Sequence, residues 1–122
     1  MSRELDAEVA RALGWTDIHD NAYTPAGQVM CGTPPEGTTP TWSSGRGVVP
    51  HFSTDIAAAY AMEQAIIERG WHQARYYVEL VKVITDDRPH DNIGGFDLVH
   101  ASADQRCRAF VAAFLKAKER SA

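Results

Sequence analysis

The tripeptide His-Asp-Asn occurs twice in this chain, at 19–21 and at 90–92. An imidazole beside a carboxylate can act as a general base or hold a metal ion. The same residues are common in turns, and neighbouring loop residues rarely point to one place. The sequence contains no P-loop, HExxH helix or serine nucleophile elbow that would complete an active site. We therefore favour turns over catalysis for both tripeptides, and we expect no metal and no cofactor.

A second candidate combines hydroxyl groups at a helix start with nearby cations. Ser53 and Thr54 stand just before an apolar run with helical spacing. Arg46 and His51 precede them. Hydroxyls and free backbone N–H groups at the positive end of a helix can bind phosphate. Ordinary helix capping is the favoured alternative, because the carboxylate of Asp55 complements the helix dipole and repels an anion.

A tryptophan and an arginine lie close together in a glycine-rich stretch. Trp42 is followed by Gly45-Arg46-Gly47. An aromatic face and a guanidinium group can stack on a base and pair with a phosphate. The alternative is a surface loop in which the tryptophan covers the core. The candidate ligand-binding residues are therefore Trp42, Arg46, His51, Ser53 and Thr54.

Cations also gather on the last predicted helix. We expect Arg106 and Arg108 to lie on its polar side and, with the cations of 116–120, to make the exposed face basic. Such a face is usually solvated. An acidic partner or a nucleotide phosphate is the sharper alternative.

Composition limits the classes of protein that this chain can belong to. It has 122 residues, 44% of them apolar, with 16 acidic and 12 basic residues and a net charge of −4. This length suits one core, so we expect a single domain over 1–122. The negative charge argues against a protein that coats duplex nucleic acid. No apolar run reaches the roughly 18 residues that span a bilayer, and no secretory signal is visible, so we expect a cytoplasmic protein without a membrane partner.

The two cysteines carry no metal-binding pattern. Cys31 and Cys107 lie 76 residues apart, without CxxC or finger spacing. We expect two free thiols in a reducing cytoplasm, with Cys107 on an apolar helix stripe and Cys31 in a loop.

Three segments have the periodicity or capping signals of helices. The first covers 2–13, with Ser2 as N-cap and Gly14 beyond its end. The second covers 53–69, capped by Ser53 or Thr54. The third follows Ser102, which begins an S-x-x-Q capping box. Between the first two, residues 19–50 are rich in Gly and Pro, and we expect an irregular region there with at most short strands at 23–31 or 41–44.

Two segments are predicted as strands. Residues 75–84 alternate with apolar side chains on both faces, which predicts a central strand that includes Tyr76 and Tyr77. Residues 96–100 are a candidate partner strand. We expect Trp71 to pack the end of the preceding helix against the next element. The predicted class is α/β: a small single-domain layered sandwich, with a short central sheet flanked by about three helices.

Three pieces of the chain resemble a known family. Residues 5–15, with Leu13-Gly14-Trp15, are followed by Pro50-His51-Phe52-Ser53-Thr54-Asp55-Ile56 and its Ala-rich continuation to Tyr60, and then by 101–115 with Arg106-Cys107-Arg108-Ala109. In this order they are similar to the small phage-encoded proteins called phage ABA sandwich domains. The resemblance implies a sheet between helical layers and a phage or prophage origin, and it implies no established reaction.

The functional expectation follows from that resemblance. Small phage proteins with layered folds often act by stoichiometric binding. We expect a non-enzymatic accessory protein of the host cytoplasm that counters antiviral defence by sequestering a small nucleotide-type signal or by binding a host defence protein, with a homo-oligomer as one way to enclose a ligand. The alternatives are a small hydrolase that uses a His-Asp pair and a structural or assembly protein of the virion.

Overall fold

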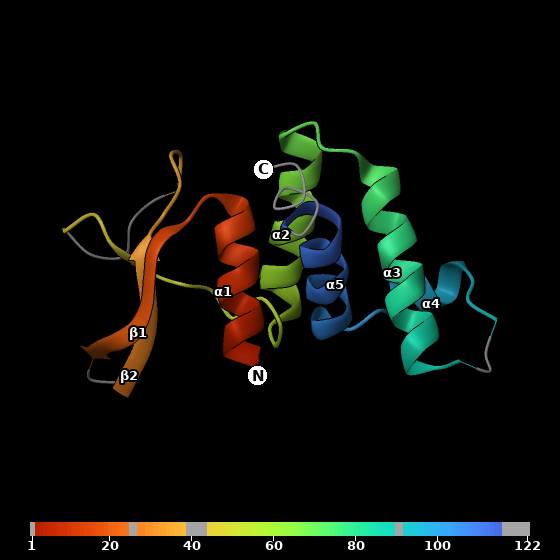
Figure 1. Cartoon of the computed structure of the whole chain (residues 1–122), viewed down its shortest axis with the longest axis horizontal. Coiled ribbons are helices and arrows are strands. Elements are labelled where there is room, and N and C mark those ends of the chain that lie inside the picture. Colours follow the sequence, from red (N-terminus) through yellow and green to blue (C-terminus); the bar gives the residue numbers. More distant parts are fainter. Residues whose placement is uncertain (1, 25–26, 39–43, 90–91, 116–122) are drawn as a thin grey trace.

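The computed structural model describes residues 2–24, 27–38, 44–89 and 92–115. The elements in chain order are α1 (Ser2–Leu13), β1 (Thr16–Thr24), β2 (Gly27–Thr33), β3 (Gly47–Val48), α2 (Ile56–Glu68), α3 (Gln73–Asp87), α4 (Gly95–Val99) and α5 (Ala103–Phe110), which continues as the π-helical segment η1 (Val111–Leu115). The sheet lies at one end of the molecule beside α1, and α2 to α5 lie on the other side of α1 (Figure 1). The small sheet with several helices confirms the predicted α/β class.

The sheet is built from a part of the chain that we had expected to be irregular. Strands β1 and β2 form an antiparallel pair in which His19 lies opposite Cys31, and β3 pairs with β2. The prediction of an irregular region over 19–50 was therefore wrong for most of these strands, the possible strand at 23–31 is found in part as the end of β1 and most of β2, and Cys31 lies in a strand. The strands approach closely at Gly32, where a Cβ atom would lie 2.9 Å from the carbonyl oxygen of Thr16. Residues 41–43 of the second possible strand lie outside the described residues.

The two predicted strands near the C-terminal half are helical. Residues 75–84 belong to α3, and 96–99 belong to α4. The buried residues of α3 are Tyr76, Leu80 and Ile84, whose spacing of four is that of one helix face. The β-branched residues of this segment favour a strand, but packing of that face against α5 overrides the propensity. Tyr76 and Tyr77 are thus helical residues, and 75–84 is not a central strand.

The helix boundaries follow from local capping. The predicted capping box of α5 is confirmed, because Gln105 N donates to Ser102 Oγ over 3.1 Å and Ser102 N donates to Gln105 Oε1 over 2.9 Å. Helix α1 ends at Leu13, and Gly14 follows with φ of 107°, a conformation that favours glycine. Helix α2 is capped by Asp55, whose Oδ1 accepts a hydrogen bond from Ala57 N, so the predicted cap at Ser53 or Thr54 was wrong.

Helix α5 lies at the centre of the helical part. It contacts α1, α2 and α3, and η1 contacts α1 and α3. Trp71 packs against Phe110 and Phe114, with ring centroids 5.9 and 4.9 Å apart, so it joins the end of α2 to α5 and η1, whereas we had expected it to pack against the next element along the chain. The largest side chains with almost no exposure are Phe110, Met62, Ile84, Val9, Val49, Asp6, Cys31 and Cys107. None of the described helices is both long and apolar enough to cross a bilayer.

Both cysteines are free and buried, as expected from the sequence. Burial raises the pKa of Cys107 from 9.0 to about 12, and the charges of Asp6, Asp104 and Glu63 add to the effect. At pH 8 its thiolate population is therefore about a thousandfold lower than that of an ordinary thiol. We expect iodoacetamide to leave Cys107 unmodified in the folded protein and to modify it readily in urea, as read by peptide mass spectrometry. Rapid modification of folded protein at pH 8 would contradict this environment.

Candidate functional site

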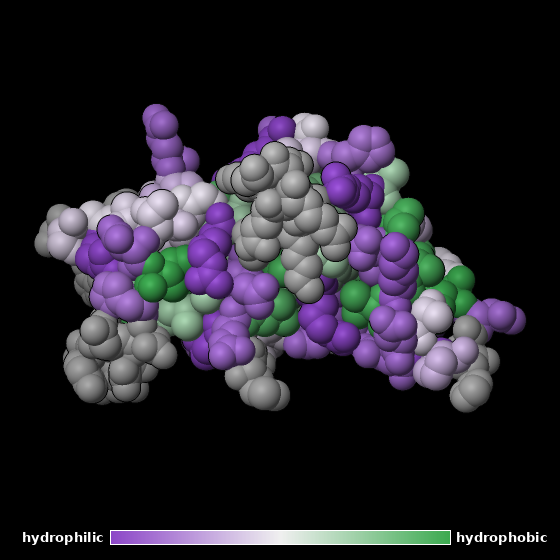
Figure 2. Space-filling view, viewed as in Figure 1, coloured by the Kyte–Doolittle hydropathy of each residue, from purple (hydrophilic) through white to green (hydrophobic). Residues whose placement is uncertain are grey.

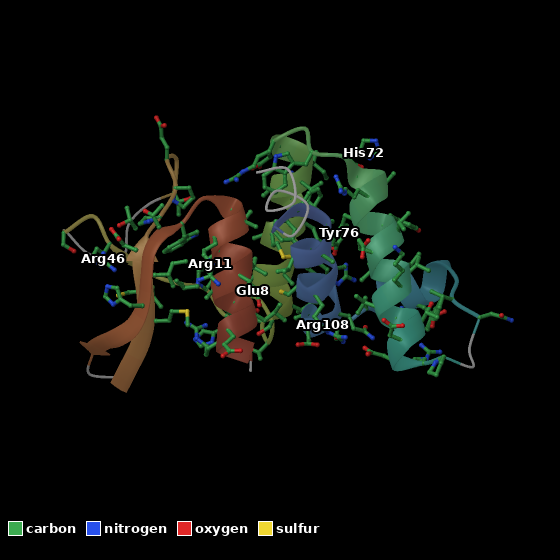
Figure 3. The ribbon with its side chains drawn as sticks, viewed as in Figure 1. Glu8, Arg11, Arg46, His72, Tyr76 and Arg108 are labelled. Carbon is green, nitrogen blue, oxygen red and sulfur yellow. The ribbon has the colours of Figure 1, made fainter. Side chains whose placement is uncertain are left out.

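The predicted ligand-binding residues fall into two neighbourhoods. Arg46 lies at the sheet, as Figure 3 shows, and bonds to residues of β1 and β2. His51 and Ser53 instead bond to residues of α1. Trp42 lies outside the described residues. The structure therefore does not bring Arg46 together with His51 and Ser53. It links Arg46 to residues of β1 and β2 that the sequence did not indicate.

The segment before α2 is held by the start of α1. Asp6, which is fully buried, accepts a hydrogen bond of 2.7 Å from Ser53 N and one of 2.7 Å from Arg3 Nη1. The same Arg3 nitrogen lies 3.1 Å from His51 Nδ1. Thr54 is exposed, and its N–H donates to the carbonyl of His51. With the Asp55 carboxylate at the first turn of α2, this segment has the geometry of a capped helix start.

Arg46 forms a defined cluster with His19 and Cys31. Its Nη2 donates to the carbonyl oxygen of Asp17 and to His19 Nε2, each over 2.8 Å, and lies 3.6 Å from Cys31 Sγ. Because a guanidinium group can only donate, His19 Nε2 must accept, so the proton of the neutral ring is on Nδ1. That nitrogen lies 4.0 Å from Cys31 Sγ. All three contacts involve Nη2, so the cluster fixes the guanidinium group of Arg46 through that one nitrogen.

The same cluster is a poor nucleophilic site. A cysteine hydrolase needs a thiolate that the substrate can reach and a histidine that accepts its proton. Cys31 is only 2% exposed, and the His19 nitrogen that faces the sulfur carries a proton. The contacts instead tie two strands together at the register pair His19 and Cys31. In the described part of the chain, no group of three or more His, Cys, Asp or Glu residues is placed to hold a metal ion.

A second feature is an exposed apolar surface on α2, which we call the α2 face and define as Ile56, Tyr60, Ile67 and the adjoining Tyr77 of α3. Their exposed fractions are 41%, 51%, 58% and 54%. Tyr77 adjoins Ile67 at a small pocket of about 160 Å³, which Glu63 and Tyr76 also line. By contrast, the side of the molecule seen in Figure 2, which carries α1, shows hydrophobic areas that are separated by hydrophilic side chains.

A buried ion pair lies beneath the α2 face. Arg106 is 6% exposed, and its Nη1 donates to both carboxylate oxygens of Glu63 over 2.9 and 2.7 Å. The prediction that Arg106 lies on an exposed polar face was therefore wrong. Its remaining nitrogens donate to the carbonyl groups of Leu98, Val99 and Ala101, so the guanidinium group is fully engaged.

Tyr76 completes this arrangement from α3 (Figure 3). Its hydroxyl donates to Glu63 Oε2, and burial together with the Glu63 charge raises the pKa of Tyr76 far above its ordinary value of 10.0. Burial lowers the pKa of Arg106, but the hydrogen bonds and charge of Glu63 raise it more. Tyrosine and arginine thus both remain protonated, and the carboxylate keeps its two donors. Both oxygens of the Glu63 carboxylate thus accept hydrogen bonds within the cluster, which suits a structural role.

The other cation of α5 is more accessible. Arg108 donates to Asp87 over 2.6 Å and to Asp104 over 2.8 Å, and its side chain is 38% exposed. Hydrogen bonds from Arg108 and Gln105 lower the pKa of Asp87. The predicted basic face is therefore neutralised at Arg108 by two carboxylates, and the cations of 116–120 lie outside the described residues.

A larger hollow of about 490 Å³ lies along the first turns of α3. Its lining residues are His72, Ala74, Arg75, Val78 and Glu79, all from one helix and its cap. A surface lined by one helix does not enclose a ligand.

Comparison with known proteins found no matching family model, no matching curated protein and no matching solved structure.

Proposed function

We propose that this protein is a non-enzymatic binding protein that captures an anionic, nucleotide-type ligand beside the sheet, with Arg46 as the main contact to the phosphate. The supporting observation is the anchoring of the Arg46 guanidinium group. Its Nη2 is fixed by Asp17 and His19, and within the described residues its Nε and Nη1 donate to no other group. A group held in place before binding loses less conformational entropy when the ligand arrives.

The remaining parts of the proposal come from the sequence. Trp42, four residues before Arg46, is the proposed stacking partner for a base. The resemblance to phage ABA sandwich domains suggests the biological setting, which is a phage or prophage accessory protein that sequesters a host antiviral signal in the cytoplasm. An anion at Arg46 would be recognised mainly through charge-assisted hydrogen bonds.

Isothermal titration with nucleotide signals, including cyclic ADP-ribose isomers, tests this proposal. We expect Arg46→Ala to raise the dissociation constant of the ligand by about 10- to 100-fold, which is the effect of losing a hydrogen bond to a charged group. The matched control is Arg11→Ala, since Arg11 is an exposed arginine of α1 and makes none of the contacts described for the Arg46 cluster. Absence of heat with wild-type protein at micromolar concentrations contradicts the proposal.

The hydrolase alternative predicts a different result in the same samples. A product would form at substoichiometric protein, and turnover would disappear in His19→Ala or His90→Ala. His19 contacts Arg46 and Cys31, and His90 lies outside the described residues.

Binding of a host defence protein is the second candidate function. The specific observation in its favour is the α2 face, because exposed apolar patches of this kind often mark protein interaction sites. Pull-down from host lysate with wild-type protein and a Tyr60→Glu variant tests it, since a partner on this surface would be lost from the variant.

A further inference from the structure

We infer that the α2 face is the contact surface between two copies of this chain, which pair their α2 helices in antiparallel orientation about a two-fold axis. The first observation is the distribution of apolar residues around α2. Its buried residues are Ala59, Met62 and Ile66, whereas Ile56, Tyr60 and Ile67 are exposed. The exposed residues flank the buried stripe, and the polar Gln64 and Glu68 lie farther around the helix. The apolar surface of α2 is therefore wider than the part that its own chain covers.

The spacing of the outer residues is that of a helix-packing seam. Ile56, Tyr60, Glu63 and Ile67 follow one another at intervals of four, three and four residues. This alternation places them on one stripe, as in the a and d positions of a coiled coil. The thirteen residues of α2 give a stripe about 20 Å long. A second α2 presents the same stripe, and antiparallel pairing sets Ile56 of each copy against Ile67 of the other.

The charge of the seam favours an identical partner. A two-fold axis brings like groups together, so an uncompensated charge near the axis would repel its own copy. Glu63 is the one ionisable seam position that carries a charge at neutral pH, and Arg106 neutralises it within the same chain. The chain as a whole carries a net charge of −4. Two copies therefore need an internally neutral surface to approach, and the α2 face supplies one.

The size of the patch also fits a dimer. Two half-exposed tyrosines and two half-exposed isoleucines offer roughly 300 to 400 Å² of apolar surface. A standard interface buries about 800 Å² on each partner, of which somewhat more than half is apolar. Val99 of α4, which is 67% exposed and whose carbonyl oxygen binds Arg106, extends the patch at its edge. Polar residues around the patch can form the rim.

Sedimentation equilibrium of the full chain at micromolar concentrations tests the inference. We expect wild-type protein to have twice the monomer mass of 13.4 kDa. Tyr60→Glu and Ile67→Glu should each shift the dimer dissociation constant upward by more than 100-fold, because each buries a new charge in the seam, opposite Glu63 of the other copy for residue 60 and opposite Ile56 of the other copy for residue 67. Val78→Glu is the matched control, since Val78 is 53% exposed and lines the separate hollow along the first turns of α3, and it should remain dimeric.

The orientation has its own measurement. In a variant with Ile56→Cys and Ile67→Cys, mild oxidation should produce a covalent dimer whose cross-linked peptides join 56 of one copy to 67 of the other. Ile67→Cys alone should form little covalent dimer, because the two copies of residue 67 lie at opposite ends of the seam. Cross-links of 67 to 67 would overturn the antiparallel arrangement.

Three outcomes overturn the inference as a whole. The first is a wild-type protein that sediments as a monomer over the full concentration range. The second is a dimer that persists in Tyr60→Glu, and the third is a Val78→Glu variant that dissociates as strongly as Tyr60→Glu. A monomer that loses a host protein on Tyr60→Glu would assign the surface to that partner. Far-UV circular dichroism of each variant confirms folding. Binding of a nucleotide at Arg46 is independent of these results, because Arg46 lies at the sheet and not on the α2 face.

Discussion

Replacing Arg106 with alanine is expected to lower the free energy of unfolding by about 3 to 5 kcal/mol. The change leaves the carboxylate of Glu63, whose side chain is 22% exposed, without its bidentate partner. It also removes the donors to the carbonyl groups of Leu98, Val99 and Ala101. Tyr76 still donates to this carboxylate, but a largely buried charge that loses its cationic partner retains the cost of desolvation, which is larger than the net value of the bond itself. Urea denaturation followed by circular dichroism measures the change.

The matched control for this prediction is Arg108→Ala on the same helix. Arg108 also forms ion pairs, but it is 38% exposed, so its loss should cost about 1 kcal/mol or less. Glu63→Gln separates charge from shape, because the amide can still accept from Arg106 and Tyr76 while the ion pair is removed. We expect it to be less destabilising than Arg106→Ala. Equal destabilisation by the two arginine variants would contradict a special role for the buried pair.

Replacing Phe110 with alanine should be comparably damaging, with a loss of about 3 to 5 kcal/mol. Phe110 is fully buried at the end of α5, and its ring centroid lies 5.9 Å from that of Trp71 and 5.1 Å from that of Phe114. Removal of the ring opens a cavity where three helical segments meet, and a close-packed core cannot fill it by relaxation alone. Tryptophan fluorescence, to which Trp71 contributes with Trp15 and Trp42, gives an additional readout of the change.

Phe96→Ala is the corresponding control. Phe96 is 74% exposed on α4 and stacks only on His100 among the described aromatic contacts. Its removal should change the free energy of unfolding by about 1 kcal/mol or less. A similar loss for the two phenylalanines would mean that the arrangement of α5 and η1 is different from the one described.

The capping box at Ser102 was a reliable guide to the fold, whereas the cap predicted for α2 and a short apolar segment were not. The box at Ser102 is entirely local, and the structure confirms it. Residues 75–84 carry apolar side chains at intervals of two and of four at once, so periodicity alone could not separate strand from helix. The segment is a helix because Tyr76, Leu80 and Ile84 pack against α5. Helix α5 comes later in the sequence, so no local pattern could report this contact.

The hairpin was hidden by its composition. Gly and Pro residues surround β1 and β2, and the pairing includes register shifts between Thr16 and His19 and between His19 and Ala22. Such bulges weaken the alternation that predicts a strand. The one usable signal was the β-branched and aromatic content on both sides of residues 25–26.

The candidate sites divide in the same way. The selection of Arg46 as a residue that could meet an anion stays a prediction, and its partners Asp17 and His19 come from a strand that the sequence did not predict. Arg106 was assigned to an exposed face because most arginines lie there. Its partner Glu63 is 43 residues away, and no local pattern reports such a contact.

That separation bears on how the chain acquires its structure. Residues 63 and 106 can meet only after a long loop has closed, and α1 packs on α5 and η1, which lie close to the other end of the chain. Closing long loops carries an entropic penalty that slows folding. On the ribosome, α1, α2 and α3 are synthesised well before the segment that completes their shared core. Folding of this core is therefore expected to be cooperative and to wait for the synthesis of α5, and a ribosome-bound fragment ending before residue 103 should remain sensitive to protease.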